Sequence, residues 1–217
     1  MKLLIATHNR GKLIEYQEIL KDLNVELLTL DDVGIEHDVE ETGKTFEENA
    51  RLKARAYARL SGILTLADDS GLEVDALNGE PGVYSKRYAG EGIGDAARNE
   101  YLLEKLRAVP QPERAARFRC VVAIEDAGGN SWTTEGTCEG EIAFEPRGTN
   151  GFGYDPIFIV SGRGKHLAEL ASDEKNRISH RGRAAEHARE ILIEIDRKQT
   201  HKSKTPVERG ARTNRTD

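Results

Sequence analysis

ILTLADDSGLEVDAL, residues 63–77, starts as an apolar run and then sets Asp68 and Asp69 side by side. We expect a strand over 63–67 that delivers both carboxylates to one place, at the carboxyl end of a parallel strand, where open α/β sheets bind ligands. Unpaired carboxylates beside a core cost roughly several kcal/mol each, so positive charge should stand nearby. The alternative interpretation is an ordinary turn with an aspartate cap.

The segments before this stretch alternate between two periodicities. Short apolar runs at 2–6 and 25–30 predict strands, whereas the apolar spacing over 12–23 and 45–60 predicts amphipathic helices. Strands that alternate with helices are typical of an α/β fold whose sheet contains parallel pairs.

The second half of the chain has a different pattern. Asp95 is expected to cap a helix that continues to about residue 106, and the GGN turn at 128–130 joins two runs that predict antiparallel strands. A last helix is expected over about 179–197. We therefore predict one two-lobed domain over residues 1–196, with a β/α half and a β-rich lobe.

Composition excludes several classes of protein. The 217 residues are 37% hydrophobic and 32% charged, and no stretch approaches the ~20 apolar residues that cross a bilayer. The N-terminus lacks the length of a secretory signal, so we expect a cytoplasmic protein without a membrane partner. Cys120 and Cys138 match no metal-ligand spacing and are expected to be reduced thiols.

Charge is distributed unevenly along the chain. Residues 197–217 contain seven Lys or Arg and two acids, a net charge of +5, which leaves −11 on residues 1–196. The basic segment has almost no apolar residues and is predicted to be a disordered tail. The acidic body is unsuited to binding nucleic acid through its phosphates, so we expect no nucleic-acid partner.

The first candidate site is THNRGK, residues 7–12, which lies between a predicted strand and a predicted helix. Free backbone N–H groups and the positive end of the helix dipole favour an anion at such a place, and Lys12 adds a charge. The pattern is not a Walker motif, and plain loop chemistry is the alternative.

The second candidate site is VEETGKTFEENARLKA, residues 39–54. One carboxylate of the pair at 40–41 is expected to project into a cleft, and the acids at 47–48 suit the first turn of a helix. Asn49 and Lys53 are four residues apart and share one helix face. A solvated helix start is the alternative interpretation.

Two further segments have the chemistry to bind a nucleoside. GTNGFGYDPIF, residues 148–158, forms a glycine-rich loop whose aromatic side chains can stack on a base. Lys175, His180 and Arg181 bring donors to the start of the last helix, although His180 alone would more often be structural. Carboxylates beside phosphate-binding groups indicate Mg²⁺ as the cofactor.

Six motifs together resemble the inosine triphosphate pyrophosphatase family. They are THNRGK, EETGKTFEENARLKA, ADDSGLEVDAL, PGVYSKRYAG, GTNGFGYDPIF and KNRISHRG, which occur in the order and with the spacing of that family over residues 1 to about 196. The departures are small: His8 and Arg10 occupy variable positions, and Asn150 stands where the family would have Gly.

The resemblance implies an elongated α/β fold, with a two-lobed mixed sheet, flanking helices and a central nucleotide-binding cleft, assembled as a homodimer. It implies Glu41 and Asp69 as Mg²⁺ ligands and Asp69 as the catalytic base; the residues alone do not choose between Asp68 and Asp69. The implied substrate-binding residues are Thr7, His8, Asn9, Arg10, Gly11, Lys12, Lys53, Ser70, Phe152, Gly153, Tyr154, Asp155, Lys175, His180 and Arg181.

The implied reaction is the Mg²⁺-dependent hydrolysis of non-canonical purine nucleoside triphosphates such as ITP, dITP and XTP. Water would attack the α-phosphorus and release pyrophosphate and a nucleoside monophosphate, which would cleanse the nucleotide pool. Two alternatives stay open: a pyrophosphatase for modified pyrimidine nucleotides, and a nucleotide-binding sensor without turnover. The SHR segment at 179–181 favours purines, and Glu41 with Asp69 favours turnover.

Overall fold

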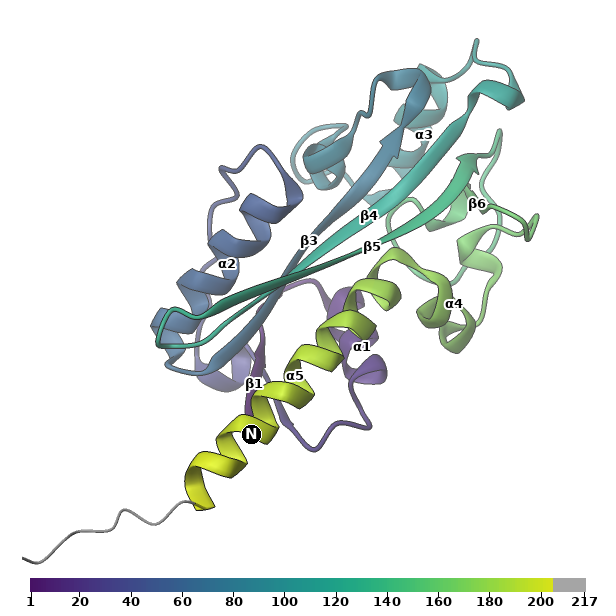
Figure 1. The fold of residues 1–217 in the computed structure, drawn as a ribbon. Helices are drawn as coiled ribbons and strands as arrows, with labels where there is room; N and C mark the ends of the chain where they lie inside the picture. The colour runs from purple at the N-terminus through teal and green to yellow at the C-terminus, as the bar shows by residue number, and fades with distance from the viewer. Residues whose placement is uncertain (205–217) are drawn as a thin grey trace, which may run out of the picture.

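A single six-stranded mixed sheet runs the length of the molecule in the computed structural model, which describes residues 1–204, with side chains through residue 198 (Figure 1). The spatial order is β2-β1-β3-β4-β5-β6. The strands are β1 (Lys2–Ile5), β2 (Glu26–Thr29), β3 (Leu64–Val74), β4 (Ala115–Glu125), β5 (Ser131–Ile142) and β6 (Phe158–Val160). The principal helices are α1 (Arg10–Ile19), α2 (Phe46–Ser61), α3 (Asp95–Lys105), α4 (Ser172–Ile178) and α5 (His180–Lys204). The predicted class, a mixed α/β sheet with flanking helices, is confirmed.

The sheet changes from parallel to antiparallel at β3. Strand β1 pairs in parallel with β2 and with the first residues of β3, whereas β3, β4, β5 and β6 pair antiparallel. Strand β1 ends at Ile5, but β3 continues to Val74 along β4. The prediction of a strand that stops at residue 67 is therefore wrong, because the polar residues that follow are paired with β4.

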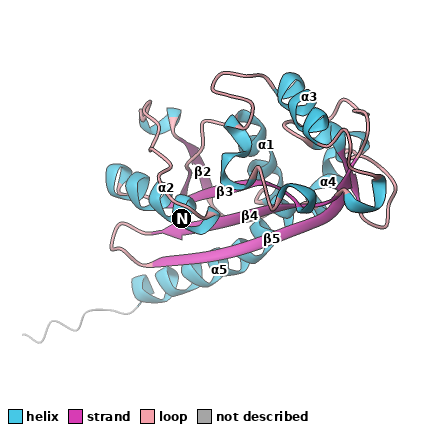
Figure 2. Ribbon diagram, turned by 90° about the horizontal axis from the view of Figure 1, so that it is seen from above, coloured by secondary structure: helices cyan, strands magenta, loops and turns pink. Residues whose placement is uncertain are grey.

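Helices cover the two faces of the parallel half (Figures 1 and 2). Helix α2 lies on one face, where its alanines pack on Leu4, Ala67 and Val121. Helices α1 and α5 lie on the other face, over a cluster that includes Leu66 and Val122. A third cluster, around α3 and β6, forms the core of the opposite end. Side chains from several elements can therefore line a pocket between the two ends of the sheet.

Strand alternation separates the two aspartates of β3. Neighbouring side chains on a strand point to opposite faces of the sheet. Asp69 therefore faces α2, together with Ala67, while Asp68 and Ser70 face α1 and α5. The expectation that both carboxylates reach one place, at the end of a parallel strand, is wrong: they lie within a strand and serve different faces.

Several helix boundaries also differ from the prediction. Helix α1 covers 10–19 rather than 12–23, and α5 continues to Lys204, into the segment predicted as a disordered tail. Residues 205–217 of that segment lie outside the described residues. The short α4 was not predicted, because seven residues carry too little periodicity. Gly94, not Asp95, is the N-cap of α3.

Two composition-based expectations concern thiols and membranes. Cys120 and Cys138 are buried free thiols. Within residues 1–204, no helix combines the length and the apolar content that crossing a bilayer requires.

Candidate active site

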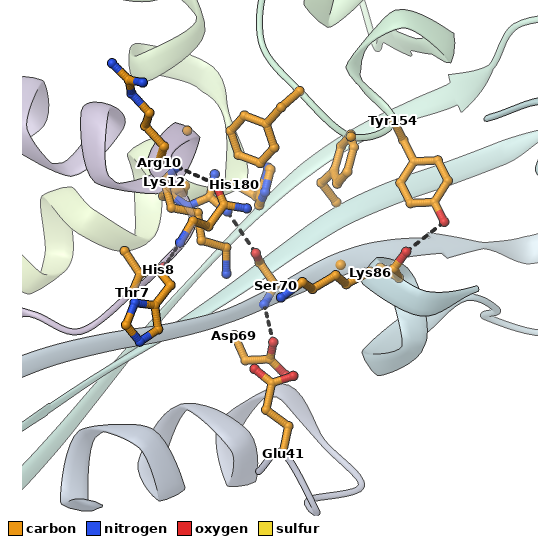
Figure 3. Close-up of a pocket in the computed structure, with 18 of the residues that line it drawn as sticks. Thr7, His8, Arg10, Lys12, Glu41, Asp69, Ser70, Lys86, Tyr154 and His180 are labelled. Carbon is orange, nitrogen blue, oxygen red and sulfur yellow. Dashed lines mark hydrogen bonds between the residues drawn. The ribbon is translucent and has the colours of Figure 1, made fainter. Parts of the chain in front are cut away.

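One pocket of ≈ 420 Å³ contains every residue predicted to bind substrate or metal (Figure 3). Its walls come from the β1–α1 turn, α2, the middle of β3, the 148–155 loop and the start of α5. The pocket lies where β1 has ended and β3 continues, so side chains from both faces of the sheet can reach it. Its volume suits a small organic ligand. The individual roles of the residues stay predictions.

The β1–α1 turn presents a helix start to the pocket. Asn9 is the N-cap of α1, and its side-chain oxygen accepts the backbone N–H of Lys12 at 3.1 Å. The Thr7 hydroxyl accepts the backbone N–H of Asn9 at 3.1 Å. These bonds fix the turn so that the positive end of the α1 dipole and the Lys12 ammonium face the same space.

Asp68 is a buried counter-ion for protein cations. Its carboxylate lies 2.9 Å from Lys12 Nζ and 3.5 Å from Arg181 Nε, and it does not line the pocket. Burial opposes its ionisation, but Lys12 and Arg181 outweigh burial and hold the pKa of Asp68 well below its usual range. The positive charge that this carboxylate requires therefore comes from the chain itself.

Asp69 lines the pocket, and burial and neighbouring charges shift its pKa in the opposite direction from that of Asp68. It accepts hydrogen bonds from Asn49 Nδ2 at 3.0 Å and from the backbone N–H of Ser70 at 3.0 Å, and Lys53 Nζ lies 3.8 Å away. Burial raises the pKa of Asp69, and the nearby Glu41 carboxylate adds to this effect against the lysines. A carboxylate of raised basicity in a cleft suits proton transfer.

Glu41 points toward Asp69, and Figure 3 shows their carboxylates close together. Lys53 Nζ lies 2.5 Å from Glu41 and bridges the two carboxylates. Burial disfavours the Glu41 anion, but Lys53 outweighs it and lowers the pKa of Glu41. The capping box of Thr45 and Glu48 sets the direction of α2 and thereby places Lys53 between the acids.

Glu41 and Asp69 have the donor chemistry that a magnesium ion requires. Mg²⁺ takes hard oxygen ligands and commonly uses one or two protein carboxylates with water and phosphate oxygens. The residues the structure describes contain no cluster of three or more His, Cys, Asp or Glu able to enclose a metal by themselves. Glu41 and Asp69 could therefore hold Mg²⁺ only together with water and phosphate oxygens.

The far end of the pocket contains an aromatic ring and two cationic side chains that are fixed by ion pairs. Lys175 Nζ lies 4.9 Å and Arg181 Cζ 5.5 Å from the centre of the Phe152 ring. Both cations bind Glu15, a buried residue of α1, and Lys175 also binds Asp155 at 2.7 Å. The aromatic face and the donors on this wall suit a flat heterocycle with oxygen at its edge.

His180 is buried and stacked on Phe118, with ring centres 4.7 Å apart and an interplanar angle of 11°. Burial, together with Arg181 and Lys175, holds the pKa of His180 well below its usual range. The imidazole is therefore neutral near pH 7 and offers one N–H donor rather than a charge.

Sequence reasoning did not assign several residues that the structure places at the pocket. Lys86 lines it from the segment PGVYSKRYAG, a motif that the resemblance had already singled out. Asp95 and Arg98 also line it, although Asp95 was expected only as a helix cap. Glu15 does not line the pocket but binds Arg181, a partner far away in sequence. Asn49 had a partial signal, since it shares a helix face with Lys53.

Comparison with known proteins agrees with this geometry. The model of the Ham1 family matches residues 3–191. This chain belongs to the Ham1 family. Among curated members, the dITP/XTP pyrophosphatase of Bacillus subtilis (strain 168) is 50% identical over 189 residues, 87% of this chain and 96% of the relative. That of Geobacter sulfurreducens is 53% identical over 183 residues, 84% and 92% of the two chains.

Solved structures of the Ham1 family share the fold. The Ham1 protein of Coxiella burnetii superposes with a TM-score of 0.82 at 47% identity, covering 89% of this chain and 99% of that one. The dITP/XTP pyrophosphatase of Mycobacterium abscessus gives a TM-score of 0.71 at 45% identity, covering 87% and 98%. The resemblance found in the sequence is therefore confirmed.

Proposed function

We propose that this protein hydrolyses ITP, dITP and XTP to the nucleoside monophosphate and pyrophosphate. The observation that carries the proposal is the meeting, in one pocket, of the α1 start, the facing carboxylates Glu41 and Asp69, and the Phe152–Lys175–Arg181 wall. Membership of the Ham1 family and the names of the curated relatives support it.

Magnesium is the proposed cofactor, held by Glu41 and Asp69. When bound, it would neutralise phosphate oxygens and make water more acidic. A triphosphate carries about four negative charges, so an otherwise acidic body needs local cations to accept it. Lys12, Lys53 and Lys86 line the pocket and supply them.

The proposed reaction is an in-line displacement at the α-phosphorus. The oxygen of a water molecule forms the new bond to phosphorus, and the bond from phosphorus to the bridging oxygen breaks. Asp69 Oδ takes the proton of the water. The electron pair of the broken bond leaves with pyrophosphate, whose charge Lys12 and the N–H groups of α1 stabilise.

Selectivity would come from the donors at the far end of the pocket. Hypoxanthine and xanthine carry an oxygen where adenine carries an amino group. His180 and Arg181 line this end, and an adenine amino group would leave their donors unpaired. Sites that are built to bind a particular polar group reject its analogue by several orders of magnitude.

The decisive measurement is pyrophosphate release from ITP, dITP and XTP in the presence of Mg²⁺. We expect kcat/KM for ITP to exceed that for ATP and GTP by about 100-fold or more. EDTA should abolish release, since the charge of the metal would be lost. Tight ITP binding without release would favour a sensor, and preferred cleavage of modified pyrimidine nucleotides would favour the other enzyme class. Either result contradicts the proposal.

We also propose a homodimer, on the resemblance described above. Multi-angle light scattering of the full chain would measure the mass directly, and a monomer at micromolar concentration would contradict this assembly.

A further inference from the structure

The N-terminal part of α3 holds the backbone N–H and the backbone carbonyl of one residue in the 148–155 loop, Gly153. Asp95 Oδ2 accepts the backbone N–H of Gly153 at 2.6 Å, and Asn99 Nδ2 donates to the Gly153 carbonyl at 3.1 Å. These contacts join residues more than fifty positions apart. They are not part of the phosphate-binding turn or of the carboxylate pair.

Asp95 is free to make this contact because it does not cap its own helix. Gly94 is the N-cap, and Asp95 begins α3. The other carboxylate oxygen of Asp95 accepts Arg98 Nη1 at 3.0 Å, while Arg98 Nη2 donates to the Ile93 carbonyl at 2.8 Å. The side chain of Asp95 is 49% exposed, so the ion pair contributes little to stability. Its geometric effect is to turn the carboxylate toward Gly153.

Gly153 stands between the residues that form the nucleoside end of the pocket. Its φ of +64° lies in the left-handed region that favours glycine. Phe152 precedes it, with its ring beside Lys175 and Arg181, and Tyr154 follows it, with its hydroxyl on the Ser85 carbonyl at 2.9 Å. A shift of the Gly153 backbone would move the Phe152 ring relative to the two cations.

We propose that Asp95 and Asn99 are positioning residues that fix the 148–155 loop for recognition of the base. This inference rests on the proposed function and deepens it, because it assigns the placement of the base-stacking ring to α3. Arg98 assists by orienting Asp95. Asp95 and Asn99 bind Gly153 rather than the phosphate-binding turn at 7–12, although the Phe152 ring packs against Gly11 of that turn. Loss of the α3 contacts should therefore affect base binding more than phosphate binding.

The test compares two product fragments as ligands, inosine monophosphate and inorganic pyrophosphate, by calorimetry in the presence of MgCl₂. Asp95→Ala should weaken binding of inosine monophosphate about tenfold or more, the factor expected for a lost hydrogen bond to a charged group, and weaken pyrophosphate binding much less. Asn99→Ala should act in the same direction. Asp95→Asn should restore part of the affinity, because its amide oxygen still accepts an N–H.

Glu100→Ala is the matched control, since Glu100 is an exposed acid on the same helix and does not line the pocket. Equal weakening of both ligands, or no change in inosine monophosphate binding by Asp95→Ala, would overturn the proposal. Wild-type protein serves as the reference for the function itself. If it fails to release pyrophosphate from ITP, the proposed function fails; if it turns over normally while Asp95→Ala behaves like wild type, only the positioning role fails.

Discussion

At the scale of single residues, Asp68 and Asp69 show how strand geometry divides two identical side chains between different tasks. Asp68 is held as an anion by Lys12 and Arg181, behind the pocket wall. Asp69 has a raised pKa and is exposed to the pocket. A raised pKa means that the ionised form of Asp69 destabilises the fold, whereas ionised Asp68 stabilises it.

The two aspartates should therefore respond oppositely to the same change. Asp69→Asn should reduce kcat for ITP by orders of magnitude, because it removes the base and a metal ligand together, while the free energy of unfolding is kept or raised. Asp68→Asn should lower the free energy of unfolding by about 3 kcal/mol, since it leaves Lys12 without its anion and Arg181 with Glu15 alone. Urea denaturation and pyrophosphate release, measured on both variants, check this. Wild-type turnover in Asp69→Asn would refute the assignment.

At the scale of elements, the close approach of α5 to β5 determines where its first residues lie. A Cβ atom on the buried Gly136 of β5 would come within 2.3 Å of the His180 carbonyl and 2.5 Å of Ala184 N. Gly136 pairs with Cys120, which pairs with Ser70, so this row leads directly to the site. From its position over this row, Arg181 reaches the Ser70 hydroxyl at 2.8 Å.

Gly136→Ala should push the start of α5 away from the sheet. We expect a loss of about 1–3 kcal/mol in the free energy of unfolding, the usual cost of overpacking, together with a raised KM for ITP. Gly128→Ala, in the exposed turn before β5, is the control and should change stability by about 0.5 kcal/mol or less. Thermal unfolding and steady-state kinetics provide the measurements. Indistinguishable behaviour of the two variants would show that α5 does not depend on this glycine.

The elements that could be predicted from sequence are those with a local signal. Strands β1 and β2 are marked by apolar runs, and α2 by its helical apolar spacing and its capping box. Each of these signals lies within the element itself. The polar half of β3 was not predicted, because it is a strand only through its pairing with β4, about fifty residues away. The site motifs were predictable as a set, but the separate surroundings of Asp68 and Asp69 follow only from that longer strand. Asp95 was misassigned as a cap because its actual partner, Gly153, is distant in sequence.

At the scale of the whole molecule, Glu15 connects helices from both ends of the chain. From α1 it binds Lys175 of α4 at 2.7 Å and Arg181 of α5 at 2.5 Å. Burial opposes its ionisation, but Arg181 and Lys175 outweigh burial and lower the pKa of Glu15 below its ordinary value of 4.5. Below that pH the unfolded chain binds more protons at this residue than the folded protein does, so stability falls as the pH falls.

Glu15→Gln should accordingly be destabilised by about 2 kcal/mol at pH 7, the scale of a hydrogen bond to a charged group. The difference from wild type in the free energy of unfolding should shrink below about pH 4.5, because protonation of wild-type Glu15 then removes the stabilisation that its anion provides. Urea denaturation of both proteins at pH 7 and pH 4 tests this. A difference that stayed constant or grew toward low pH would contradict the role of Glu15 as a buried anion.

The two-residue repeat of β3 has a consequence for how this gene can change. Inserting one codon just before Asp68 would move Asp68 into the place of Asp69 and Asp69 into that of Ser70, whereas deleting one would move Asp69 into the buried place of Asp68 and Ser70 into that of Asp69. Point substitutions alter one side chain at a time, whereas such a frame-preserving indel would move every following side chain of the strand to the opposite face. We expect natural length variation in this protein to be confined to its loops and absent from this strand.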